Sequence, residues 1–278
     1  MNREEIHSQR QSIIRDAAEC VRGKTDHLPT VGIILGSGLG GLADRIDDAV
    51  AIPFGDIPGF STSTAGGHRG QLILGTLAGV SVIAMAGRFH RYEGWTNDQV
   101  TFPIHVMAAL GATSLIVSNA AGGLNTKLRV GDILVIRDHI NLIGGQFESI
   151  ESLPHPGIGR SSIVYDPVMS DAAMTASREH NFAAYEGTYL ATLGPTYETR
   201  SEYRMMRRIG ADVAGMSTVP EVLAANRLQM RILGLSMVSN IASPDVAVVA
   251  DHNEVLQAGK EAEAKMEAIV RYVLSHCK

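Results

Sequence analysis

Short apolar runs alternate with helix-like stretches along most of this chain. Runs stopped by glycine or polar residues predict buried strands, which we place at 31–35, 71–77, 80–86, 114–118, 133–136, 187–193, 212–215 and 232–238. Apolar positions at helical spacing predict helices, which we place at about 3–23, 199–209, 220–228 and from 253 onward. Strands that alternate with helices predict an α/β fold around a largely buried mixed sheet.

The chain shows no internal repeat and no linker-like tract, so we predict one domain spanning residues 1–278. Residues 143–166 contain four glycines and two prolines with little periodicity. We expect a long loop there, and loops of that length are commonly functional.

Composition narrows the classes of function. The formal net charge is −5, which argues against a nucleic-acid-binding surface because such a surface needs a basic patch. No apolar run is long enough for a membrane span, and residues 1–20 lack a signal-peptide core. The two cysteines, Cys20 and Cys277, have no metal-site spacing. We therefore expect a cytoplasmic protein without a metal site or a membrane partner.

A glycine-rich segment, 36–41, spells GxGxxG after the first predicted strand. A dinucleotide-binding fold would also need a second strand ending in an acidic residue about 20 residues later. Residues 51–59 hold two prolines, and no such strand is visible there. A loop whose amides and Ser37 hydroxyl bind phosphate is favoured over a structural turn or a dinucleotide site.

The segment 87–95 is basic and aromatic. In an extended conformation Arg88, His90 and Tyr92 alternate onto one side, where the guanidinium fork could bind phosphate. His68 offers another imidazole in a glycine-containing loop. A charged solvated edge is the alternative interpretation.

Further polar residues stand at predicted strand ends and helix starts. Ala120 lies in a small-residue segment after a strand, and Asn240 ends another. Tyr197 and Glu198 precede a helix, where an acidic residue can equally be a capping device. Remaining candidates are Met216 and Ser217 before the helix at 220–228, and His252 before the terminal helix.

Taken together, these segments resemble the trimeric class of purine nucleoside phosphorylases. The resemblance runs in order from about residue 31 to the C-terminus, through segments 36–40, 67–68, 87–94, 118–125, 138–141, 194–199, 215–222 and 252–256. It implies a single α/β domain with a distorted mixed sheet flanked by helices, a homotrimer, and no metal or organic cofactor.

The resemblance also implies a role for each candidate residue. Phosphate would be held by Ser37, His68, Arg88, His90, Ala120 and Ser217. The ribose would be lined by His90, Tyr92, Met216 and His252, and the purine by Tyr197, Glu198 and Asn240. Glu93 would orient His90. The catalytic residues would be Asn240, His90 and Glu198.

The implied reaction is phosphorolysis of inosine, guanosine and their 2′-deoxy forms, a step of purine salvage. Phosphate attacks C1′ while the glycosidic bond breaks, and Asn240 donates to N7 of the departing base. Glu198 accepts from N1–H, which adenine lacks, so 6-oxopurines are preferred. We expect inorganic phosphate as the only co-substrate.

Residues 143–167 depart from the family pattern, in which an aromatic residue reaches the ribose site of a neighbouring subunit. Phe147 and Tyr165 are the candidates for its place. Rival functions are a methylthioadenosine phosphorylase, a dehydrogenase built on the GxGxxG loop, and a non-catalytic nucleoside-binding protein. Asn240 and His252 disfavour the first, because a 5′-methylthio group favours an apolar pocket.

Overall fold

The computed structural model describes residues 3–36, 39–61, 69–144, 163–243 and 252–277, with backbone only at 3–4, 6–7 and 252–257. Its strands are β1 Val31–Leu35, β2 Asp47–Pro53, β3 Gln71–Leu77, β4 Val80–Ala86, β5 Ser114–Gly123, β6 Ile133–Asn141, β7 Ala184–Ala191, β8 Val213–Gly215 and β9 Arg231–Ile241. Its helices are α1 Arg3–Arg22, α2 Asn97–Ala109, α3 Pro167–Glu179, α4 Arg200–Arg208, α5 Val219–Arg227 and α6 His252–His276, with short 3-10 turns at η1 Gly40–Arg45, η2 Phe54–Asp56 and η3 Arg91–Glu93.

The strands form one mixed sheet in the order β2-β3-β4-β1-β5-β8-β7-β6-β9. Because β9 also pairs with β5, the strands from β5 to β9 form a closed circuit, and β1 to β4 extend from it as an open wing. Strands β4, β1, β5 and β9 are parallel neighbours. Their carboxyl ends therefore meet at one edge of the sheet.

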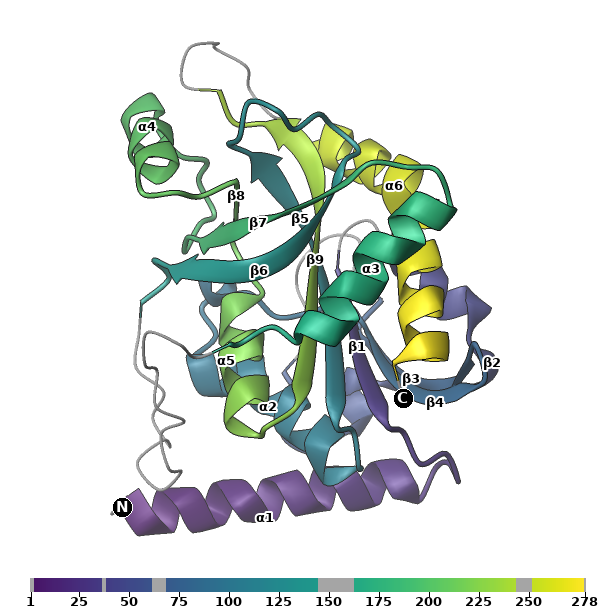
Figure 1. The fold of residues 1–278 in the computed structure, drawn as a ribbon. Coiled ribbons are helices and arrows are strands. Elements are labelled where there is room, and N and C mark those ends of the chain that lie inside the picture. The colour runs from purple at the N-terminus through teal and green to yellow at the C-terminus, as the bar shows by residue number, and fades with distance from the viewer. Residues whose placement is uncertain (1–2, 37–38, 62–68, 145–162, 244–251, 278) are drawn as a thin grey trace.

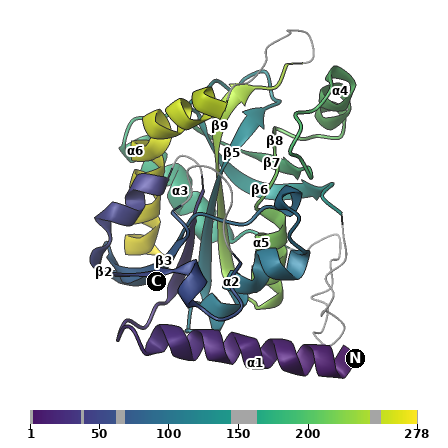
Figure 2. The same ribbon diagram turned by 180° about the vertical axis from the view of Figure 1, so that it is seen from behind.

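Helices cover both faces of this sheet (Figures 1 and 2), and buried apolar side chains form a layer on each face. Along β1, Ile34 faces the layer completed by α1, α2 and α5, whereas Ile33 and Leu35 face the layer completed by α3 and α6. A strand buried on both faces appears in the sequence as a continuous run of apolar residues. This explains why the buried strands were visible in the sequence.

The predicted α/β fold with a mixed sheet is confirmed, and β1, β3 and β4 have the predicted bounds. Several strands are longer than predicted. The segment 119–123, expected to follow a strand, is the second half of β5, and β9 continues through Asn240. Small and polar residues are tolerated there because this end of both strands faces a pocket.

Two helices were missed, for a physical reason in each case. Helix α2 is buried on most of its surface, so its sequence shows no amphipathic stripe; its capping box, Thr96 with Gln99, was the available signal. Helix α3 follows directly on the irregular 143–166 segment, and its signal was Asp166 as N-cap with Pro167 in the first turn.

No strand ending in an acidic residue was visible in 51–59 and the structure has none there, but the end of an edge strand was missed. Strand β2 ends at Pro53, at the outer edge of the sheet, where proline is tolerated. It pairs antiparallel with β3, so it does not form the parallel β-α-β unit of a dinucleotide-binding fold. No helix within the described ranges has both the length and the apolar content needed to cross a bilayer.

Candidate active site

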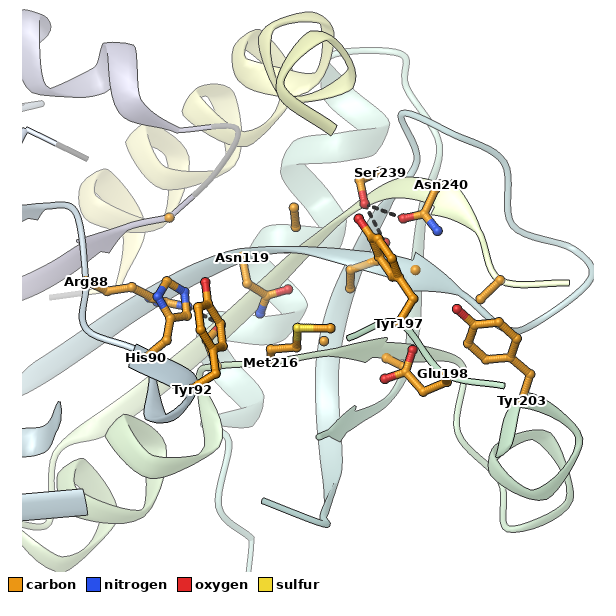
Figure 3. Close-up of a pocket in the computed structure, with 18 residues that line it drawn as sticks. Arg88, His90, Tyr92, Asn119, Tyr197, Glu198, Tyr203, Met216, Ser239 and Asn240 are labelled. Carbon is orange, nitrogen blue, oxygen red and sulfur yellow. Dashed lines mark hydrogen bonds between the residues drawn. The ribbon is translucent and has the colours of Figure 1, made fainter. Parts of the chain in front are cut away.

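A pocket lies where the carboxyl ends of β1, β4, β5 and β9 converge, with further walls from β8 and from the segment leading into α4 (Figure 3). It brings together many of the residues predicted from sequence. These are Arg88, His90, Tyr92, Ala120, Tyr197, Glu198, Met216, Ser217 and Asn240. Residues separated by about half of the chain thus share one cavity because the sheet order places their strands side by side.

Three predicted residues cannot be placed in this way. Ser37 and His68 lie outside the described residues. His252 is the first residue of α6, for which the backbone alone is described. Sequence reasoning also missed three polar residues that line the pocket: Asn119, Tyr203 and Ser239.

Arg88 forms the buried base of one end of the pocket, with only 2% of its surface exposed. Its Nη1 donates to Ser217 Oγ at 2.6 Å and to Thr218 Oγ1 at 3.0 Å. Its Nε lies 3.4 Å from Oε1 of Glu221, whose side chain is equally buried. A buried cation needs such compensation, because its desolvation penalty is several kcal/mol.

The backbone beside Arg88 is held in an unusual conformation. Thr218 has a φ of +72°, which a β-branched residue rarely adopts and which costs about 1–3 kcal/mol. Its hydroxyl accepts from Asn119 Nδ2 at 2.9 Å as well as from Arg88. Helix α5 begins at the next residue, so the positive end of its dipole adds to the charge of Arg88. This end of the pocket is suited to an anion.

His90 and Tyr92 form the adjoining wall. The Glu93 carboxylate accepts from the His90 backbone N–H at 2.8 Å and contacts Nδ1 of its ring at 2.9 Å. Because a carboxylate only accepts, Nδ1 is the protonated atom in this bond. The two rings of His90 and Tyr92 stack at 4.7 Å. Burial, followed by the charge of Glu93, raises the pKa of Tyr92, which keeps its hydroxyl a donor.

The opposite end of the pocket carries Glu198 and Asn240. Glu198 Oε1 accepts from Thr192 Oγ1 at 2.9 Å. Asn240 Oδ1 accepts from Ser239 Oγ at 2.8 Å (Figure 3). That bond fixes the amide with Nδ2 as its donor side. Tyr197 stands at the mouth of the pocket with 48% of its surface exposed.

The pocket is therefore polarised along its length. A buried guanidinium and an imidazole occupy one end, a carboxylate and an amide occupy the other, and Tyr92 and Met216 lie between them. Such a site fits a ligand with an anionic group near one end and ring N–H groups at the other. Within the described ranges, no group of three His, Cys, Asp or Glu side chains is arranged to hold a metal ion.

Tyr165 does not take the place of the family's intersubunit aromatic residue. Its side chain is 2% exposed in its own chain, and its hydroxyl lies 3.1 Å from Nδ1 of His139. A ring packed into the core cannot reach a neighbouring subunit. Phe147, the other candidate, lies outside the described residues.

Comparison with known proteins gives a consistent result over nearly the whole chain. The sequence profile of the phosphorylase superfamily matches residues 30–275. Purine nucleoside phosphorylase 1 of Bacillus subtilis is 45% identical over 94% of this chain and 97% of its own length. The Rattus norvegicus purine nucleoside phosphorylase is 44% identical over 92% of each chain. A Schistosoma mansoni purine nucleoside phosphorylase in complex with inosine is 35% identical, with a TM-score of 0.88, over 96% of this chain and 97% of that chain.

We predict that Glu221→Gln lowers the free energy of unfolding by about 3 kcal/mol, because the buried Arg88 loses the carboxylate that faces it. Urea unfolding measures the change. The matched control is Glu186→Gln, which neutralises the exposed partner of Arg137 and is expected to cost less than about 1 kcal/mol. Equal losses in the two variants would contradict this role for the buried pair.

Proposed function

The chain belongs to the purine nucleoside phosphorylases of the phosphorylase superfamily, and from that premise we propose that its pocket binds inorganic phosphate together with a 6-oxopurine ribonucleoside. The reaction is phosphorolysis, which gives the free base and ribose 1-phosphate. The observation that carries the proposal is the polarity of the pocket: Arg88 and Ser217 lie at one end, and Glu198 and Asn240 at the other.

Phosphate occupies the Arg88 end in this proposal. The guanidinium fork and the Ser217 hydroxyl match phosphate oxygens, and Ala120 on β5 contributes its backbone amide. His90 completes this end, with its orientation fixed by Glu93. Ser37 and His68, which the family resemblance adds to the set, stay predictions.

The ribose lies between the two ends, against Tyr92 and Met216. His252, near the 5′-hydroxyl, stays a prediction from the resemblance. A phosphate oxygen attacks C1′ as the bond to the purine breaks, so positive charge develops on the sugar. The bound phosphate dianion stabilises that charge, and its fixed position makes the attack effectively intramolecular.

Negative charge develops on the departing purine at the same time. The Ser239 hydroxyl holds Oδ1 of Asn240, so the Nδ2 donor can be directed at N7. A preorganised donor of this kind acts on charge that appears only in the transition state. Removing one such hydrogen-bond donor commonly lowers the reaction rate by about 100- to 1,000-fold.

The preference for 6-oxopurines over adenine follows from the Glu198 carboxylate. Glu198 accepts from N1–H of hypoxanthine or guanine and also from the 2-amino group of guanine, and Tyr197 flanks the ring. Adenine has no N1–H and would leave the carboxylate unpaired, a mismatch of about 1–3 kcal/mol. We therefore propose inosine, guanosine and their 2′-deoxy forms as substrates.

The remaining parts of the proposal do not come from the pocket. A homotrimer, a role in purine salvage and a reaction that needs no metal or organic cofactor rest on the family, and a cytoplasmic location rests on the composition of the chain. The two cysteines, both unpaired thiols in the structure, are compatible with a reducing compartment.

The proposed reaction is tested by base release from inosine, guanosine, xanthosine and adenosine, each with and without inorganic phosphate. We expect release from inosine and guanosine only when phosphate is present, and poor release from adenosine. Release without phosphate would identify a hydrolase, and rapid phosphate-dependent release from adenosine would overturn the selectivity.

We further expect Asn240→Asp to shift activity toward adenosine. An aspartate accepts from a 6-amino group but faces the oxygen of a 6-oxopurine unfavourably. The ratio of kcat/KM for inosine to that for adenosine should fall by about 10-fold or more. If kcat/KM for inosine and for adenosine fell by the same factor, Asn240 would contribute to catalysis but not to the choice of base.

A further inference from the structure

The start of helix α4 places Tyr203 beside the carboxylate of Glu198. Thr199 is the N-cap, and its hydroxyl accepts from the backbone N–H of Glu202 at 3.3 Å, while Glu202 Oε2 accepts from the Thr199 N–H at 2.6 Å. In such a capping box, the residue before the cap and the fourth helical residue lie side by side. Those positions usually hold two apolar side chains, but here they hold Glu198 and Tyr203.

Tyr203 is half-buried, and it lines the same pocket as Glu198. Burial and the negative charge of Glu198 raise the pKa of Tyr203 to about 12, so the phenol keeps its proton at neutral pH. The ring packs against a small apolar cluster that includes Met206 and Ala242. Tyr203 thus presents a protonated hydroxyl within the pocket lining that also contains Glu198 (Figure 3).

A hydroxyl from another element donates to the Glu198 carboxylate. Thr192 follows β7, and its Oγ1 donates to Glu198 Oε1 at 2.9 Å. A carboxylate has about four acceptor positions. With Thr192 and Tyr203 both donating, about two positions are left, and these match N1–H and one N–H of the 2-amino group of guanine.

We propose that Thr192 and Tyr203 form a hydroxyl clamp that positions Glu198 and thereby sets the preference for 6-oxopurine over 6-aminopurine nucleosides. The proposal rests on the proposed function, in which Glu198 receives the base. Neither clamp residue needs to touch the reacting atoms, so both are positioning residues.

The clamp acts on both kinds of base. A held carboxylate meets N1–H without first losing rotamer freedom, which favours hypoxanthine and guanine. Adenine presents the N1 lone pair to the same carboxylate, and a held carboxylate cannot turn away from it. Releasing the clamp should therefore weaken the correct substrates more than the wrong one.

The test uses Tyr203→Phe, Thr192→Val and the double variant, each of which removes a hydroxyl and keeps nearly the same shape. We expect Tyr203→Phe to lower kcat/KM for inosine and guanosine by about 10-fold and the double variant to lower it further. The value for adenosine should change by less than about 3-fold. Tyr272→Phe is the matched control, because Tyr272 donates to Glu179 at 3.3 Å on another part of the molecule.

A double-mutant cycle separates positioning from a general structural role. Introduced into a Glu198→Gln background, Tyr203→Phe should change kcat/KM for inosine by less than about 2-fold, because its partner has already lost its charge. The same loss in both backgrounds, an equal loss for all nucleosides, or no loss at all would each overturn the clamp.

Failure of the clamp and failure of the proposed function give different results. A wild-type protein without phosphate-dependent release from inosine would refute the function itself. Calorimetric titration with hypoxanthine then measures the clamp independently of turnover. Tyr203→Phe should weaken the Kd for hypoxanthine by about 10-fold, and an unchanged Kd would contradict the clamp.

Discussion

The buried positive charge of Arg88 is the constraint on which the arrangement of this pocket depends. A guanidinium out of contact with water is stable only where oxygen atoms surround it, and here they come from Ser217, Thr218 and Glu221. Arg88 follows β4 in the open wing of the sheet, whereas its partners follow β8 or lie in α5. One charge thus connects the two parts of the sheet and holds the strained backbone at Thr218.

The opposite end of the pocket is organised by hydrogen bonds to hydroxyl groups. Ser239 fixes the amide of Asn240, and Thr192 holds the carboxylate of Glu198. Because a hydroxyl already occupies one atom of each group, the Asn240 amide has a defined direction in which it can donate and the Glu198 carboxylate a defined direction in which it can accept. The site therefore holds charge and hydrogen-bonding direction in place before any ligand arrives, which is what electrostatic catalysis requires.

The sequence predicted much of this fold because the central strands are apolar on both faces, and it predicted most pocket residues through the family resemblance. It could not predict helix α2, whose burial removes the amphipathic pattern. Tyr203 was missed because a tyrosine within a basic helix looks like a surface residue. The capping box of Thr199 and Glu202 can be recognised in the sequence, and it places Tyr203 beside Glu198. Tyr165 was a candidate for the aromatic residue that reaches a neighbouring subunit, but its ring is packed into the core of its own chain.

The central claim is that phosphate held at the Arg88 end of the pocket is the nucleophile. The most direct measurement is product analysis by mass spectrometry after inosine is incubated with the protein and phosphate labelled with ¹⁸O at every oxygen. The account predicts ribose 1-phosphate that carries all of the label, including the oxygen bonded to C1′. Free ribose, with the labelled phosphate unconsumed, would contradict it.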